Sequence, residues 1–194
     1  MRTLRLPPAD LSKRAVPLTR QSAGCWLRIH AAGVSPIDFS LKGYHRFSHS
    51  ACKHQILYLG GAVQTCLWER FGDVVLDNLH VVPRSLWMSA YVSEIRLPAL
   101  KVCDLTKVRT RAVLMVDLTA LMSHELAVPQ AWSLAIQQHP AGFEAIRFLS
   151  RWNQLPCLAL FNQANLKLKT KLTSPLVGSR EAANWIERHK ISLV

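Results

Sequence analysis

Short apolar runs separated by turn-forming residues constrain the fold of this chain more than any other feature. Each run has the length of a β-strand and ends near glycine or proline, such as Gly60 and Pro98. Segments with apolar residues at helical spacing lie between them. The pattern predicts an α+β fold, with central mixed sheets and flanking helices. The strand-like runs are 25–30, 56–59, 91–97, 101–105, 145–149 and 157–161.

Helices are expected at 62–71, 117–126, 129–138 and 179–189. Pro129 suits a first helical turn, and Ser179 is a good N-cap. In the first of these helices, Thr65 and Glu69 share a face that differs from the main apolar stripe. We therefore expect a rigid helix to hold the Glu69 carboxylate away from the core.

The chain has 194 residues, enough for one sizeable core, with 49% hydrophobic and 19% charged residues. This composition excludes a disordered chain. Residues 1–24 combine basic side chains with Pro7, Pro8 and Pro17 and are expected to form an N-terminal arm. Residues 25–194 are expected to form a single folded domain.

The formal net charge of +12 favours phosphorylated ligands, nucleic acid or an acidic protein partner. The five cysteines form no CxxC pair, which is typical of thiols in a reducing compartment. No secretory signal and no apolar run long enough for a membrane span is present. We expect a cytoplasmic protein that does not bind membranes.

An ordered set of short motifs runs through most of the chain. Arg28, Arg46, Tyr58, Glu69 and Ser150 are the polar residues that stand out within it. Each is unremarkable alone, since such residues commonly occupy surfaces or cores. The motifs are 26–30, 35–39, 45–48, 57–59, 65–69, 103–106, 130–132, 148–151 and 158–161.

In this order and spacing the motifs resemble the RES-domain family, which is named for a recurring Arg, Glu and Ser. The resemblance implies a fold related to ADP-ribosyltransferases and a toxin that degrades NAD by phosphorolysis or hydrolysis. It also implies restraint by a helix-turn-helix antitoxin. The chain departs from the commoner family pattern at His45, where many relatives have glycine.

The resemblance implies that Arg28 and Arg46 bind NAD. Guanidinium groups suit charge-assisted contacts to the pyrophosphate or to an attacking inorganic phosphate. The ring of Tyr58 is suited to stack on the cationic nicotinamide or the adjoining ribose. NAD is then a substrate, phosphate is a candidate co-substrate, and no resident cofactor or metal is expected.

Glu69, Arg46 and Ser150 are the expected catalytic residues. Cleavage of the nicotinamide–ribose bond develops oxocarbenium character, which a fixed carboxylate stabilises. Glu69 is the candidate for this role, and it could instead hold a ribose hydroxyl and polarise an acceptor. Ser150 is expected to hydrogen-bond phosphate or ribose, with Arg151 as a further candidate in the same region.

Other functions remain open from the sequence. His45, His49, Cys52 and His54 offer zinc-binding atoms, but their spacing matches no usual zinc framework. A non-catalytic protein- or nucleic-acid-binding module could use the basic ends and the tryptophans at 26, 152 and 185. Packing in the core is the simpler interpretation of these tryptophans, so no direct binding of nucleic acid is expected. Transfer of ADP-ribose to a protein is the alternative enzymatic activity.

Overall fold

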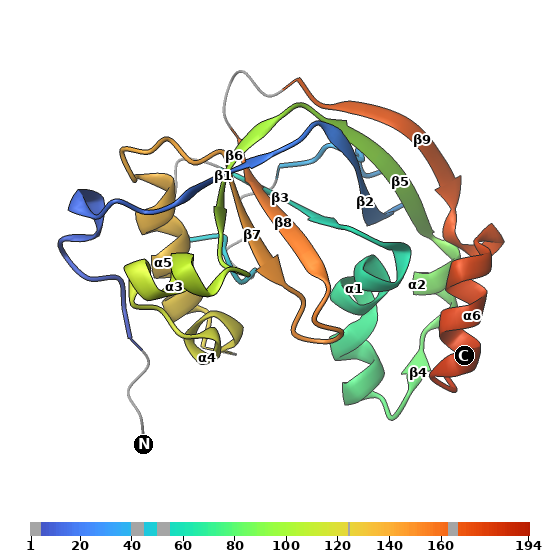
Figure 1. The fold of residues 1–194 in the computed structure, drawn as a ribbon. Helices are drawn as coiled ribbons and strands as arrows, with labels where there is room; N and C mark the ends of the chain where they lie inside the picture. Colours follow the sequence, from blue (N-terminus) through green and yellow to red (C-terminus); the bar gives the residue numbers. More distant parts are fainter. Residues whose placement is uncertain (1–4, 40–44, 50–54, 124, 163–166) are drawn as a thin grey trace.

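A computed structural model describes residues 5–39, 45–49, 55–123, 125–162 and 167–194. It has an α+β architecture, as predicted, built on a large mixed sheet with helices at both ends (Figure 1). The sheet has eight strands in the order β1-β6-β7-β8-β3-β2-β5-β9. Only the β6–β7 pair among these neighbours is parallel. The strands are β1 (Leu18–Gln21), β2 (Gly24–Ala31), β3 (Ile56–Gly60), β5 (Ala90–Leu97), β6 (Leu100–Asp104), β7 (Ala145–Leu149), β8 (Pro156–Phe161) and β9 (Lys169–Pro175).

Two groups of helices cover the two ends of the sheet (Figure 1). One group surrounds the core formed by Leu114, Leu121 and Trp132, and the other packs around Phe71 and Trp185. A short parallel pair, β4 (Val81–Val82) with β10 (Ser192–Leu193), ties the C-terminus to the second group. The first group comprises α3 (Val108–Leu114), α4 (Leu118–Met122) and α5 (Ala127–Gln137), and the second α1 (Val63–Asp77), α2 (Arg84–Met88) and α6 (Arg180–Arg188).

The two halves of the sheet meet at a narrow join. Strands β2 and β3 are paired at one register position, Leu27 with Gly60, whereas β2 pairs with β5 over its whole length. Beyond that position the halves are free to separate, because no backbone hydrogen bonds hold β2 against β3. The opening between them provides the space for a cavity.

The six predicted strands are all present, with small differences in their bounds. Helix α6 begins as expected, because the Ser179 side chain accepts a hydrogen bond from the Ala182 amide. Helix α1 is longer than predicted and continues to Asp77. Helix α4 is shorter than predicted, with Asp117 as its N-cap, and α5 begins two residues before Pro129.

Part of the segment expected to form an N-terminal arm lies in the sheet and the core. Strand β1 pairs with β6, and Leu11 and Val16 are buried. The indole Nε1 of Trp132 in α5 donates a hydrogen bond to the Arg5 carbonyl. The sheet therefore includes residues from the predicted arm, 1–24, as well as from the predicted domain, 25–194. Within the described part of the chain, no helix is both long and apolar enough to cross a bilayer.

Candidate functional site

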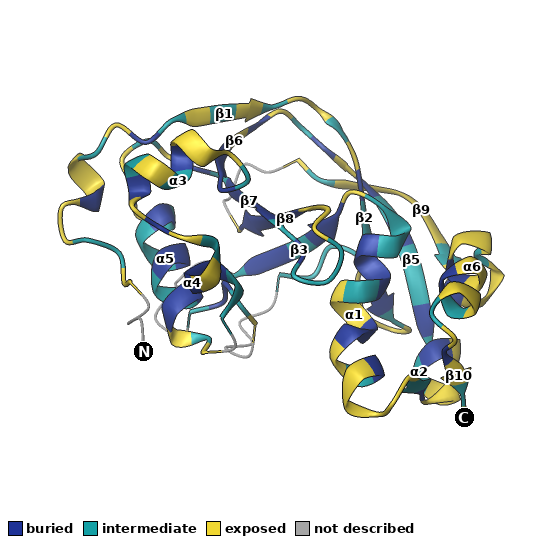
Figure 2. Cartoon of the chain, turned by 60° about the horizontal axis from the view of Figure 1, so that its bottom comes forward, coloured by how far each residue is buried: buried dark blue, intermediate teal, exposed yellow. Residues whose placement is uncertain are grey.

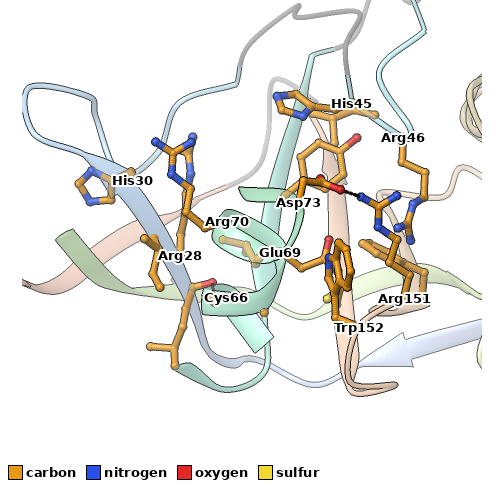
Figure 3. Close-up of a pocket in the computed structure, with 18 of the residues that line it drawn as sticks. Arg28, His30, His45, Arg46, Cys66, Glu69, Arg70, Asp73, Arg151 and Trp152 are labelled. Carbon is orange, nitrogen blue, oxygen red and sulfur yellow. Dashed lines mark hydrogen bonds and ion pairs between the residues drawn. The ribbon is translucent and has the colours of Figure 1, made fainter. Parts of the chain in front are cut away.

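A cavity of about 560 Å³ lies between the two halves of the sheet (Figure 3). Its walls come from β2, β3, one face of α1, the 45–46 segment and the turn after β7. The predicted site residues, although far apart in the sequence, are gathered here. Those that line the cavity are Arg28, Arg46, Tyr58, Glu69 and Arg151. Ser150 lies behind them, fully buried, and contacts Glu69.

A short hydrogen bond joins Ser150 to Glu69. The Ser150 Oγ donates to the Glu69 Oε1 at 2.6 Å, and the Trp152 backbone N–H donates to the same Oγ at 3.3 Å. A serine hydroxyl has a single proton to donate, so Ser150 directs it at the carboxylate. Ser150 thus orients Glu69, and its expected contact to phosphate or ribose stays a prediction.

Arg46 presents a half-buried cation to the cavity. Its guanidinium carbon lies 5.6 Å from the centre of the Phe148 ring, and its buried Nη1 has no hydrogen-bond partner among the described residues. Burial lowers the pKa of Arg46, and the nearby carboxylate of Glu69 opposes this change. A charged donor with an unmet hydrogen bond is suited to receive an anionic oxygen.

Tyr58 anchors the segment that carries Arg46. Its hydroxyl accepts a hydrogen bond from the Phe47 amide at 2.9 Å and lies 3.3 Å from the Ser48 Oγ. Burial raises the pKa of Tyr58 to about 12, so its hydroxyl stays protonated in the physiological range. Its ring also packs at a tilt against His45, 5.6 Å between centroids. Stacking of this ring on a ligand stays a prediction.

A Tyr58→Phe variant should lower the free energy of unfolding by about 1–3 kcal/mol, because the buried Phe47 amide loses its acceptor. Urea denaturation measures this change. Tyr91→Phe is the matched control, since within the described chain the Tyr91 hydroxyl makes no hydrogen bond. Equal destabilisation of both variants would contradict the anchoring role.

Arg28 is engaged with the neighbouring 35–38 loop. Its Nη1 donates to the carbonyls of Pro36 at 2.8 Å and Asp38 at 3.2 Å, and its Nη2 lies 4.0 Å from the Asp38 carboxylate. Burial lowers the pKa of Arg28, and the charge of Asp38 opposes this change. Arg28 therefore shapes one wall of the cavity by holding this loop, with fewer donors available for a ligand.

Several lining residues were missed by sequence reasoning. Arg70 and Asp73 line the cavity beside Glu69, and Asp73 forms an ion pair with Arg151. His30 lines it too, with its Nε2 2.8 Å from the Ser93 Oγ and its Nδ1 3.1 Å from the Ala31 carbonyl. Asp73 follows Glu69 by four residues, the spacing of one helix face, but the predicted helix ended at residue 71 whereas α1 continues to Asp77.

The alternative sites considered from the sequence involve three tryptophans and four candidate zinc ligands. Trp26 and Trp185 are buried in the core, and Trp152 stacks on Trp68, so these rings are occupied in packing. Of the four residues considered for zinc, Cys52 and His54 lie outside the described residues. Among the residues that the structure describes, no cluster of three or more His, Cys, Asp or Glu side chains could hold a metal.

The fold and the site together define an α+β protein with a basic cavity and one oriented carboxylate. The family model described as RES domain matches residues 8–180, which is most of the chain. The chain belongs to the RES-domain family. No curated protein matches the sequence.

A solved structure has a similar fold. The chain is similar to one in the crystal structure of the M. tuberculosis MbcT–MbcA toxin–antitoxin complex. The TM-score is 0.70 at 15% identity, over 94% of this chain and 98% of that chain. At this identity the similarity establishes the shared fold.

Proposed function

We propose that this chain is an NAD-degrading enzyme that breaks the bond between nicotinamide and ribose, with phosphate or water as acceptor. One observation carries the proposal: the Glu69 carboxylate, oriented by Ser150, faces the same cavity as the Arg46 guanidinium. Membership in the RES-domain family supports it. The cavity volume falls within the range of about 300–1000 Å³ that is typical of small-molecule sites.

Glu69 is proposed to stabilise the positive charge that develops on the ribose. As the C1–N bond breaks, its electron pair leaves with nicotinamide, and an oxygen of phosphate or water forms the new bond to C1. When water is the acceptor, it loses a proton to the solvent. A preorganised negative charge beside C1 lowers the barrier without reorganisation during the reaction. The hydrogen bond from Ser150 restricts the rotamer of Glu69, which is the preorganisation that this role needs.

The pyrophosphate of NAD is proposed to lie against Arg46. The unmet N–H of its guanidinium and the low exposure of its surroundings favour a charge-assisted hydrogen bond to a phosphate oxygen. Arg151 is a second donor on the same wall, once its ion pair with Asp73 is exchanged or shared. The net charge of +12 further attracts an anionic substrate.

Product analysis tests this proposal. The purified chain is incubated with NAD in buffers with and without phosphate, and the products are identified by mass spectrometry. Nicotinamide with ADP-ribose phosphate indicates phosphorolysis, and nicotinamide with free ADP-ribose indicates hydrolysis. Label from the ADP-ribose half of NAD that ends on a protein indicates the transferase alternative. NAD that stays intact under both conditions would overturn the proposal.

We further propose that the chain is a toxin restrained by an antitoxin of the helix-turn-helix class. The neighbouring fold comes from a toxin–antitoxin complex, which supports an antitoxin partner. The basic surface favours an acidic group in that partner. Expression of the chain alone should arrest growth, and the product of a neighbouring gene should restore growth and co-purify with it. Normal growth under expression of active protein would refute the toxin assignment.

A further inference from the structure

A single turn is docked along one face of helix α1. This turn, residues 150–153 between β7 and β8, is here called the hairpin tip. Figure 3 shows Trp152 and Arg151 of the tip next to the helix that carries Glu69 and Asp73. Polar contacts between described residues tie the tip to the helix, and they include Asn153 with Thr65 at 3.3 Å, Ser150 with Glu69 at 2.6 Å, and the Arg151–Asp73 ion pair.

Gly72 makes this docking possible. A Cβ at this position would lie 2.5 Å from Cε2 and 2.7 Å from Nε1 of Trp152, closer than any real contact allows. The indole therefore lies flat on the helix backbone at Gly72. Two further contacts hold the indole in place. It stacks on Trp68 with ring centroids 5.9 Å apart, and the Arg151 guanidinium lies over it, 4.6 Å from the ring centre.

The order of residues in the tip explains why the position of the Trp152 indole on Gly72 affects the Glu69 carboxylate. Trp152 is two residues from Ser150, and its backbone N–H donates to the Ser150 Oγ that holds Glu69. The tip is also a tight turn, in which the Ser150 amide donates to the Leu155 carbonyl and the Gln154 amide to the Ser150 carbonyl. A displacement of the indole is therefore passed to the Ser150 hydroxyl.

We infer that Trp152 and Gly72 are positioning residues for the reaction: the indole seated on the glycine sets the hydrogen bond by which Ser150 orients Glu69. This inference rests on the proposed function, since it assigns Glu69 its working geometry. Neither residue needs to touch the substrate for this role. Arg46 and Arg28 lie outside the tip, whereas Arg151 and Trp152 of the tip line the same cavity. Because Arg46 remains in place as the proposed main contact to the pyrophosphate, an altered tip should lower kcat through Glu69 more than it changes KM.

The test is a double-mutant cycle of Gly72→Ala and Trp152→Ala, assayed by NAD cleavage. The added methyl group displaces the indole, and a displacement near 1 Å costs up to roughly 100-fold in rate. Gly72→Ala should therefore lower kcat by roughly 10- to 100-fold with a smaller change in KM. In the Trp152→Ala background the same substitution should change kcat less than about twofold, because the overlap is gone. Equal losses in both backgrounds, or an unchanged kcat in Gly72→Ala, would overturn the inference.

Gly178→Ala is the matched control, because a Cβ there meets nothing within 4 Å. It should leave kcat and KM unchanged. If Gly72→Ala does not fold, the double variant should fold, since the clash is relieved and alanine is the better helix former. Failure of both to fold would show that the indole is not the obstacle and would refute the inference.

Amide hydrogen exchange separates this inference from the proposed function. Gly72→Ala should speed exchange of the 150–155 amides relative to the wild type and Gly178→Ala, whatever the enzyme does to NAD. A wild type that does not cleave NAD, together with this exchange pattern, would refute the proposed function. The packing of the Trp152 indole on Gly72 would still be supported. An active wild type with unchanged exchange and unchanged kcat in Gly72→Ala would refute the inference alone.

Discussion

A Glu69→Gln variant should cleave NAD about 100- to 1000-fold more slowly than the wild type, with little change in the KM for NAD. The amide keeps the size of the side chain and can still accept the hydrogen bond from the Ser150 Oγ. It removes the negative charge that faces the cavity, so the loss reports on stabilisation of the developing oxocarbenium charge. Initial rates at saturating NAD measure the effect.

Asp77→Asn is the control for this charge change. Asp77 ends the same helix and does not line the cavity, so its variant should cleave NAD at the wild-type rate. Thermal unfolding should show both variants folded, because Glu69 is exposed to the cavity rather than packed in the core. Wild-type turnover in Glu69→Gln would remove the carboxylate from the mechanism.

Loss of the Arg46 side chain is expected to have the second large effect. Arg46→Ala should lower kcat/KM for NAD by roughly 10- to 100-fold, since one hydrogen bond to a charged group contributes about 1.5–3 kcal/mol. Arg46→Lys should recover part of this loss, because a lysine keeps the charge but not the planar pair of donors. Steady-state kinetics with NAD as the varied substrate measure both variants.

Arg109→Ala provides the comparison for a simple loss of positive charge. Arg109 is exposed on α3 and does not line the cavity, so its removal should change kcat/KM by less than a factor of about two at moderate salt. If Arg46→Ala and Arg109→Ala lose the same amount, general electrostatic attraction explains the effect. Arg46 would then have no specific contact to the substrate.

The core strands were predictable because their sequences carry the signal locally. The runs at 56–59 and 157–161 are apolar almost throughout, and both strands are buried in the structure. Strand β9 was missed since nearly all of its residues are exposed at the sheet edge, which leaves no apolar pattern to detect (Figure 2). Strand β1 was missed because it is defined by its pairing with β6, and β6 lies about 80 residues away in the sequence.

Part of the lining of the cavity was predictable from the sequence, but the contacts of these residues were not. Arg28, Arg46, Tyr58, Glu69 and Arg151 were expected near NAD and do line one cavity. The sequence contained no indication that the Tyr58 hydroxyl anchors the 45–48 segment. Such pairings depend on which side chains the fold brings within hydrogen-bonding distance.

The amino-acid sequence alone determined the class of fold, the main strands and the residues that make this a RES-domain chain, because periodicity and motif order are properties of neighbouring residues. Tertiary structure alone decided that the two halves of the sheet meet at Leu27 and Gly60 and leave a cavity. It also decided that a turn some 80 residues beyond Glu69 holds that carboxylate. The reason is physical: both features arise from long-range pairing and close packing, whose energies depend on distances in space that residue order does not contain.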